Sequence, residues 1–324
     1  MQINQTSVLL DPECRQLRFL PEGPIADGIQ GFSWVAIQHA EDATHGSLNI
    51  FDWRTRSNSN YDLPGRPGFA FPTELEGIFV AGLERRVMMV NVATGEKTVM
   101  SDEIDQNVEN TIINDGIPFS EGIIFGAKDL EFQTKKAGLY FWRVSDQSLI
   151  LLRDDQICSN GKIITGAGNT RTLLDIDTPT QQVVRYELDC DAGMLSDPEV
   201  VLDLSDLDIF PDGMVATPNG QSVIIAFYNP NAAEYGVARQ FSLANGEVEA
   251  EWRCDQAPRV TCPLLLNTED GVKLILTTAT EVMESEMFES HPNSGCLFVG
   301  DTPFDSVPVD YRFSAEQLLS LIHI

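Results

Sequence analysis

The sequence predicts an all-β fold built as a ring of similar units. Four short polar turns, each with a carboxylate or an amide beside a glycine, recur along the 324-residue chain. They are Pro21-Glu22-Gly23, Asn114-Asp115-Gly116, Ser159-Asn160-Gly161 and Pro211-Asp212-Gly213. Asn160 follows Asn114 by 46 residues, Asp212 follows Asn160 by 52, and the 92 residues from Glu22 to Asn114 are twice 46. A period of about 40–50 residues is typical of the blades of a β-propeller.

Short apolar or alternating runs, bounded by Gly, Pro, Asn or Asp, fill most of the chain, and such runs predict strands. In chain order the expected strands are Gly31–Ile37, Ser47–Trp53, Gly77–Gly82, Val87–Val92, Gly122–Gly126, Gly138–Val144, Thr172–Ile176, Val183–Leu188, Ser222–Tyr228, Val237–Leu243, Val248–Trp252, Val272–Thr278 and Gly295–Val299. Thr94-Gly95 and Asn245-Gly246 indicate tight hairpins between paired runs. Only residues 314–322 are expected to be helical, with Ser314 as the N-cap and Glu316 close behind it.

These elements predict a six-bladed β-propeller, with four-stranded antiparallel blades around a central channel. The blades are expected to begin near Glu22, Phe69, Asn114, Asn160, Asp212 and Cys262. Ser7–Leu10 is the expected closing strand, because pairing the two chain ends in one blade protects the exposed edges. We expect residues 1–324 to form a single domain that ends in the short helix.

The composition excludes some partners. The chain carries 21 Lys plus Arg against 49 Asp plus Glu, a formal charge of −28. Such a balance repels phosphate backbones and anionic lipid headgroups, so we expect neither nucleic acid nor a membrane as partner. The six cysteines form no CxxC pair and are expected to be reduced thiols. With no signal peptide pattern and no apolar run of about 18 residues, a cytoplasmic location is expected.

Residues at corresponding ends of the innermost strands converge on the channel of a propeller. Glu22, Asn160 and Asp212 are expected to meet there. Three oxygen donors, two of them anionic, suit a hard divalent cation such as Ca²⁺ or Mg²⁺. Asn-Gly and Asp-Gly pairs taken singly are ordinary turn signals, so the hypothesis of a shared site depends on their common period.

Other chemistries find little support in the sequence. The four histidines show no HxxxH or HExxH spacing, which argues against a histidine-rich zinc site. No GxSxG elbow, P-loop or dinucleotide fingerprint is present. The acidic run at Asp203, Asp206 and Asp208 lacks the glycine and the terminal glutamate of an EF-hand.

The four polar segments, together with Tyr228-Asn229 after the last of them, resemble the SMP-30/gluconolactonase/luciferin-regenerating family over nearly the whole chain. The resemblance implies a six-bladed propeller that binds one divalent metal and hydrolyses a small-molecule lactone. It implies that Glu22, Asn160 and Asp212 are the metal ligands and that Asn114 contacts the substrate and a metal-bound water. Asp115 matches an acidic position beside the channel, and we include it with Asp212 and Asn114 among the expected catalytic residues.

The expected chemistry follows from these roles. The cation polarises the lactone carbonyl as a Lewis acid, and Asp212 acts as the general base toward water. Such a base is needed if the ion is Ca²⁺, which acidifies water far less than Zn²⁺ does. Ca²⁺ is the expected ion, although oxygen ligation also permits Mg²⁺, Mn²⁺ or Zn²⁺.

One departure from the family concerns substrate binding. Sugar-lactonase members carry an arginine two residues before the Asn of the NDG segment, where this chain has Ile112. Lys128 and Arg66 are the candidates for a compensating cation in the channel. Asp129 and Glu131 lie near the position of another family glutamate, in an unsettled register. Nearby aromatic residues, including Phe69, Phe71 and Phe119, are expected to pack between blades rather than to line a pocket.

Two further hypotheses stay open at this stage. The absence of the arginine at Ile112 also fits a metal-bearing propeller that binds a ligand or a protein without turnover. Another chemistry built on the same ion, as in luciferin-regenerating members, is the third possibility. The sequence alone leaves the oligomeric state open.

Overall fold

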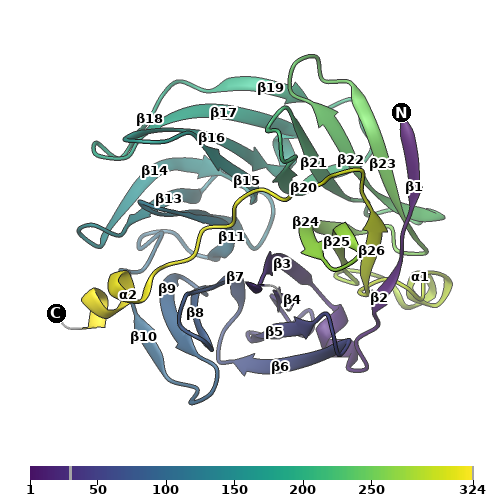
Figure 1. The fold of residues 1–324 in the computed structure, drawn as a ribbon, viewed down its shortest axis with the longest axis horizontal. Coiled ribbons are helices and arrows are strands. Elements are labelled where there is room, and N and C mark those ends of the chain that lie inside the picture. The colour runs from purple at the N-terminus through teal and green to yellow at the C-terminus, as the bar shows by residue number, and fades with distance from the viewer. Residues whose placement is uncertain (29–30, 323–324) are drawn as a thin grey trace.

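The computed structural model describes residues 1–28 and 31–322, with side chains described up to residue 318. Over these residues, six antiparallel sheets stand in a ring around a central axis (Figure 1). The six-bladed propeller predicted from the sequence is therefore confirmed. Each blade begins with an inner strand that carries one of the six expected starting residues.

The first three blades follow the chain in simple hairpin order. The first contains β3 (Pro21–Ala26), β4 (Gly31–Ala36), β5 (Gly46–Asp52) and β6 (Ser57–Leu63). The second contains β7 (Pro67–Pro72), β8 (Ile78–Leu83), β9 (Arg86–Asn91) and β10 (Lys97–Val99). The third contains β11 (Thr111–Phe119), β12 (Gly122–Asp129), β13 (Ala137–Arg143) and β14 (Ser148–Gln156).

The last three blades depart from this pattern. The fourth contains β15 (Ser159–Thr165), β16 (Thr170–Asp177), β17 (Gln182–Asp189), β18 (Met194–Leu195) and β19 (Glu199–Asp203). The fifth contains β20 (Phe210–Ala216), β21 (Ser222–Tyr228), β22 (Tyr235–Ser242) and β23 (Val248–Asp255). The sixth contains β24 (Val260–Thr268), β25 (Gly271–Thr278) and β26 (Leu297–Asp301).

The two chain ends close the ring. β2 (Ser7–Leu10) pairs antiparallel with β26, so the expected closing strand is confirmed with the expected bounds. β1 (Gln2–Gln5) pairs in parallel with β23 of the neighbouring blade, a strand that the sequence did not predict. Both strands lie at the outer side of the ring in Figure 1, where they cover the edges of two blades.

The four polar segments are strands rather than turns. Each lies within an inner strand, at a point where the pairing register with the next strand shifts, as at Asn114 and Asn160. A shift of this kind is a β-bulge, which re-aims a side chain without ending the strand. The remaining inner strands, β7 and β24, shift register in the same way. The turn signal was therefore a bulge signal that repeats around the ring.

The core lies between the blades. Phe69 and Phe71 of β7 stack with ring centroids 4.4 Å apart, and Phe69 also contacts Phe125 of β12 in the next blade. Large side chains such as Trp142 and Trp252 are fully buried. Packing between adjacent sheets thus holds the ring together and fixes where the inner strands lie.

The chain after β26 crosses the open face of the ring before it ends in α2 (Ala315–Ile322) beside β9 and β10 (Figure 1). The expected terminal helix is confirmed. Ser314 Oγ accepts the N–H of Gln317 at 3.2 Å, and Gln317 Oε1 accepts the N–H of Ser314 at 2.9 Å, which makes a capping box. Ser314 is therefore the N-cap, as expected, and its reciprocal partner is Gln317. A second helix, α1 (Ser285–Ser290), was not predicted.

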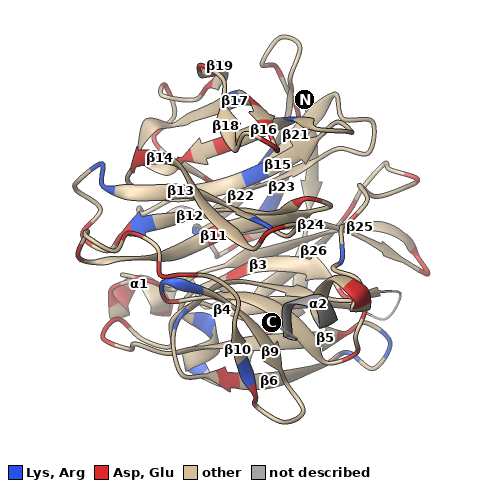
Figure 2. Cartoon of the chain, turned by 90° about the vertical axis from the view of Figure 1, so that its left-hand side faces the viewer, with Lys and Arg blue, Asp and Glu red and all other residues tan. Residues whose placement is uncertain are grey.

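All six cysteines are free, in agreement with the reading of reduced thiols. No helix among the residues that the structure covers is long and apolar enough to cross a membrane. Lysine and arginine segments are interspersed among the acidic ones on the side of the ring drawn in Figure 2.

Candidate functional site

A cavity of about 900 Å³, here called the hub cavity, opens at one end of the central axis. Glu22, Asn114, Asn160 and Asp212 all line it, each from the inner strand of a different blade. Their exposed fractions are 9%, 7%, 6% and 7%, respectively. The structure therefore brings together the three expected metal ligands and the expected substrate contact.

Glycines explain how these strands approach one another so closely. A Cβ on Gly161 would lie 2.7 Å from the backbone oxygen of Asp212, and a Cβ on Gly213 would lie 2.8 Å from Cα of Cys262. Real Cβ atoms do not tolerate such contacts, so only glycine fits beside Asn160 and Asp212. The repeated glycine thus follows from the packing of inner strands around the axis.

Hydrogen bonds fix the two amides. Asn114 Nδ2 donates to the backbone oxygen of Ser159 at 2.9 Å and to Asn160 Oδ1 at 3.0 Å. Asn160 Nδ2 donates to Thr178 Oγ1 at 2.8 Å, and that hydroxyl donates to the backbone oxygen of Pro211 at 2.8 Å. Both amide nitrogens are engaged, so the groups left to face a ligand are Asn114 Oδ1 and the second lone pair of Asn160 Oδ1, whose first lone pair accepts from Asn114.

Negative charge accumulates in the hub cavity. Burial, followed by the carboxylate of Glu22, raises the pKa of Asp212 well above its usual range. Burial, followed by the carboxylate of Asp115, raises the pKa of Glu22. Asp212 Oδ1 is buried and has no hydrogen-bond partner in the part of the chain that the structure describes. Two buried carboxylates beside each other and an orphaned oxygen fit a site for a divalent cation.

The donor set differs from the usual zinc sites. In residues 1–28 and 31–322, no group of three His, Cys, Asp or Glu side chains is placed to hold a metal ion. The hub instead offers two carboxylates and one amide, from Glu22, Asp212 and Asn160. Oxygen donors of this kind suit a hard cation that completes its shell with water.

Both candidate cations face the hub cavity, but they differ in availability. Lys128 is 5% exposed, and it makes no hydrogen bond or ion pair with another side chain that the structure describes. It pairs in the ladder with Ile112, so the two side chains share one face of the sheet. Arg66 is already held by Glu84, with its Nε 2.9 Å from Oε1 and its Nη2 2.8 Å from Oε2. Lys128 is therefore the freer cation.

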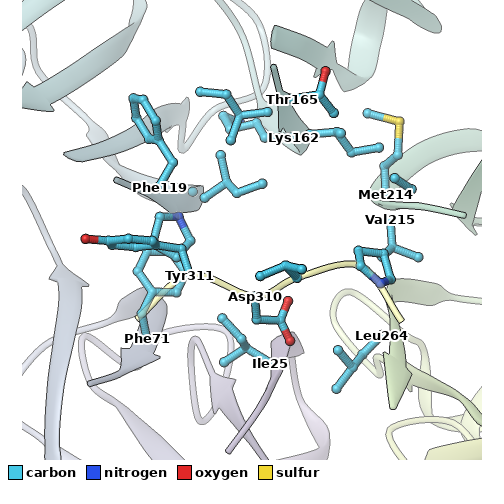
Figure 3. Close-up of a pocket in the computed structure, with 18 of the residues that line it drawn as sticks. Ile25, Phe71, Phe119, Lys162, Thr165, Met214, Val215, Leu264, Asp310 and Tyr311 are labelled. Atoms are coloured by element: carbon cyan, nitrogen blue, oxygen red, sulfur yellow. The ribbon is translucent and has the colours of Figure 1, made fainter. Parts of the chain in front are cut away.

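Asp115 lines a different cavity from Glu22, Asn160 and Asp212. It lines a second cavity of about 500 Å³, here called the far cavity, which the later residues of the same inner strands surround. Figure 3 shows side chains such as Phe71, Phe119 and Met214 around this space, which the C-terminal segment crosses at Asp310 and Tyr311. Asp115 Oδ1 accepts the N–H of Gly116 at 2.7 Å. Its negative charge raises the pKa of Glu22 from the side of the far cavity rather than from the mouth of the hub cavity.

The acidic residues of the loop after β12 bond within that loop and do not reach the hub cavity. Asp129 is fully buried and accepts the backbone N–H groups of Glu131, Gln133 and Thr134 at 3.1, 3.1 and 2.9 Å, respectively. Glu131 is paired with Lys136 at the surface. Neither acid lines the hub cavity, so neither takes the place of the family glutamate.

Several cavity residues escaped the sequence reasoning. They are Thr178, Cys158, Arg259 and Glu281. Arg259 is 3% exposed and donates to the backbone oxygens of Pro230, Glu281 and Val282. These residues come from outside the repeating polar segments, so no periodic signal could have found them.

Comparisons with known proteins agree with this architecture. A family model described as an SMP-30/Gluconolactonase/LRE-like region matches residues 20–280. YvrE of Bacillus subtilis, whose name assigns it provisionally as a sugar lactone lactonase, is 32% identical over 174 residues. A protein of Sulfolobus acidocaldarius is 27% identical over 173 residues. Each match covers 53% of this chain and 56% of the relative, so the chain spans about half the length of the curated relatives it matches.

Solved structures share the fold over more of the chain. Regucalcin of Agrobacterium tumefaciens, described as a calcium-binding protein, aligns with a TM-score of 0.76 and 18% identity over 97% of this chain and 98% of that one. A gluconolactonase of Xanthomonas campestris aligns with a TM-score of 0.64 and 14% identity, covering 93% of this chain and 90% of that one. At these identities the likeness shows the propeller fold.

Proposed function

Because this chain belongs to the SMP-30/gluconolactonase/LRE-like family, we propose that it is a divalent-metal-dependent hydrolase that opens a lactone in the hub cavity. The observation that carries the proposal is the buried Asp212 Oδ1, which has no hydrogen-bond partner in the described chain. Burying such an oxygen is costly unless a ligand satisfies it. It is therefore the group expected to meet an ion or a reacting water.

Glu22, Asn160 and Asp212 would hold the cation, and we propose Ca²⁺ as that ion because every donor is oxygen. When bound, such an ion polarises a lactone carbonyl and stabilises negative charge on its oxygen. Asn160 adds a neutral donor, fixed toward the hub because Thr178 occupies its amide nitrogen. The remaining chemistry falls to side chains of the chain itself.

Asp212 Oδ1 would take the proton from the attacking water, because it is a buried carboxylate oxygen without a hydrogen-bond partner in the described chain. Asn114 Oδ1 would orient that water or the substrate, since Asn114 Nδ2 is held by Ser159 and Asn160. Lys128 would attract the carboxylate that forms as the ring opens, because its ammonium lacks an ion pair in the described part of the cavity. Asp115 would act through its charge on Glu22.

A panel of lactones, scored by proton release, tests the proposal. Protein stripped with a chelator is reloaded in turn with Ca²⁺, Mg²⁺, Mn²⁺ or Zn²⁺, and activity is expected to return with one of them. Asp212→Asn and Glu22→Gln are expected to abolish that return. Asp206→Asn, which removes one exposed carboxylate elsewhere, is the matched control. Full activity in both hub variants would contradict the roles proposed for these two carboxylates, whereas a metal that binds without any lactone turnover would favour a binding protein instead.

A further inference from the structure

Four exposed apolar side chains, here called the apolar lip, border the hub cavity. They are Leu130, Phe132, Phe210 and Val282, with exposed fractions of 37%, 49%, 36% and 67%. They come from three segments that are far apart in the chain, namely the loop after β12, the start of β20 and the loop after β25. Exposed apolar groups gathered at one cavity are typical of a binding site.

Two members of the lip adopt backbone conformations that their residue types avoid. Phe132 has a φ of 52° and Val282 a φ of 54°, both in the left-handed region. A β-branched residue such as Val282 is a real outlier there. Strain of this kind persists only where the surrounding structure imposes it, and it gathers at ligand sites.

Buried charged groups hold both strained segments in place. The Asp129 carboxylate accepts backbone N–H groups of its loop and pairs with Lys136 at 3.0 Å, while the N–H of Phe132 donates to the backbone oxygen of Asp129 at 3.0 Å. Across the cavity, Arg259 Nη2 donates to the backbone oxygen of Val282 at 3.4 Å. The lip is therefore a fixed apolar surface rather than a loose loop.

The floor and the lip of the cavity differ in chemistry. Polar side chains such as Asn114, Lys128 and Asp212 are buried at the floor, whereas the four side chains of the apolar lip carry no hydrogen-bonding group. The polar residues that line the cavity nearer its exposed edge include Glu41 and Glu281. Gln38, another lining residue, already donates to the backbone oxygens of Ala40 and Glu41. A volume of about 900 Å³ is at the upper end of the range for sites that take drug-sized ligands. A polyhydroxylated substituent would find few partners at this lip, while an apolar one would bury its surface there.

We propose, on the basis of the lactone hydrolysis inferred above, that the natural substrate is a lactone with an apolar substituent, the ring at the floor and the substituent against the apolar lip. Water adds its oxygen to the carbonyl carbon, and the bond from that carbon to the ring oxygen breaks. The ring oxygen takes one proton from water, and the other is released when the new carboxylic acid ionises. The product is a hydroxycarboxylate whose chain still contacts Phe132 and Val282.

Hydrolysis of δ-valerolactone, δ-nonalactone and glucono-δ-lactone by the calcium-loaded protein tests this substrate class. These substrates share a six-membered ring; the first has no substituent, the second a butyl chain, and the third hydroxyls on the ring carbons together with a hydroxymethyl group. Each buried methylene raises kcat/KM by up to about fourfold, so we expect δ-nonalactone to exceed δ-valerolactone by at least about tenfold. Glucono-δ-lactone is expected to be the poorest of the three.

Variants of the apolar lip distinguish its role in substrate preference from any role in folding. Phe132→Asn and Val282→Asn keep a residue that tolerates the left-handed backbone, and each is expected to lower the ratio of kcat/KM for δ-nonalactone over δ-valerolactone by about tenfold. Thermal unfolding should show that Val282→Asn is at least as stable as the parent, because the strain is relieved. Leu151→Asn, at a side chain of β14 that is 50% exposed and borders neither cavity, is the matched control and should keep the ratio.

The outcomes distinguish the two proposals. Turnover of lactones with no preference for the butyl chain, or a preference that the lip variants retain, would overturn the substrate class and leave the hydrolase intact. No turnover of any lactone with any of the four ions would overturn both.

Discussion

Lys162, which lines the far cavity, forms a buried ion pair with Asp175, with 3.4 Å between Nζ and Oδ1. Glu22 and Asp212, in the hub cavity, are two buried carboxylates with raised pKa values: burial and then Glu22 raise the pKa of Asp212, and burial and then Asp115 raise that of Glu22. Lys162 and Asp175 both belong to the fourth blade, whereas Glu22 and Asp212 come from the first and the fifth. Lys162 lies only two residues after Asn160, on the same inner strand. Burial is therefore similar at the two ends of the axis, whereas the balance of charge is not.

This difference in charge between the two ends of the axis indicates which end carries the functional site. A buried charge that has a partner contributes to the architecture, as Lys162 does by donating to the backbone oxygen of Asn160 at 2.8 Å. The charge of Lys128 offsets the raised pKa values of Glu22 and Asp212 only in part, and Lys128 makes no ion pair with either in the described chain. Buried carboxylates without an ion-pair partner lower stability, and such arrangements gather at functional sites. We call the Lys162–Asp175 pair the balanced end of the axis, and Glu22 with Asp212 the unbalanced end. The balanced end thus holds the backbone of the inner strand that supplies Asn160 to the unbalanced end.

The largest expected effect concerns the unbalanced end. Asp212→Asn should lower kcat/KM for lactone hydrolysis by about 10²–10⁴-fold, because it removes the proposed base. In chelated protein, the same change should leave the free energy of unfolding unchanged or raise it, since one of two repelling carboxylates is gone. Lactone turnover and urea unfolding measure the two effects. Retained turnover with a large loss of stability would reverse the proposed roles of the two ends.

The balanced end should respond in the opposite way. Lys162→Met should lower the free energy of unfolding by about 3–5 kcal/mol, because Asp175 stays buried without its partner. Adding Asp175→Asn should restore most of the loss, and urea unfolding of the single and double variants measures both. A loss below about 1 kcal/mol in the single variant would show that the pair is not what holds this end.

A fall in pH should lower the free energy of unfolding by a smaller amount, through Asp129 in the loop at the mouth of the hub cavity. Burial alone would raise the pKa of Asp129, but three backbone N–H donors and Lys136 lower it to about 2. A carboxyl with a lowered pKa stabilises the fold above its unfolded value near 3.9, and the contribution disappears as the pH falls toward 2. We expect about 2 kcal/mol to be lost over that window. In Asp129→Asn, unfolding measured between pH 5 and pH 2 should lack this component, and an identical pH profile would contradict it.

The sequence predicted the ring well because its signal is periodic. Inner strands must pack closely around one axis, so the same glycine and the same bulge return in each blade, as at Gly161 and Gly213. β1 was missed because its parallel pairing depends on a strand more than 200 residues away. α1 was missed because its six residues, with only the adjacent Met287 and Phe288 apolar, show no apolar period.

The site was predictable only where it follows that period. Glu22, Asn114, Asn160 and Asp212 were found because the inner strands repeat them. Residues such as Arg259 reach the cavity from other strands and loops, where no local pattern marks them. Lys128 faces the hub cavity because of the register in which β12 pairs with β11. The spacing of residues in the sequence does not give that register.

Calorimetric titration of Ca²⁺ into chelated protein at neutral pH tests the central claim most directly. The account predicts one ion bound per chain, with affinity lowered at least about tenfold in Glu22→Gln and in Asp212→Asn and unchanged in Asp206→Asn. At about 100 times its dissociation constant, the ion should add about 2.7 kcal/mol to the free energy of unfolding of the parent protein. Equal binding by the parent and both hub variants, or no binding of Ca²⁺, Mg²⁺, Mn²⁺ or Zn²⁺, would contradict the claim that these carboxylates share a cation.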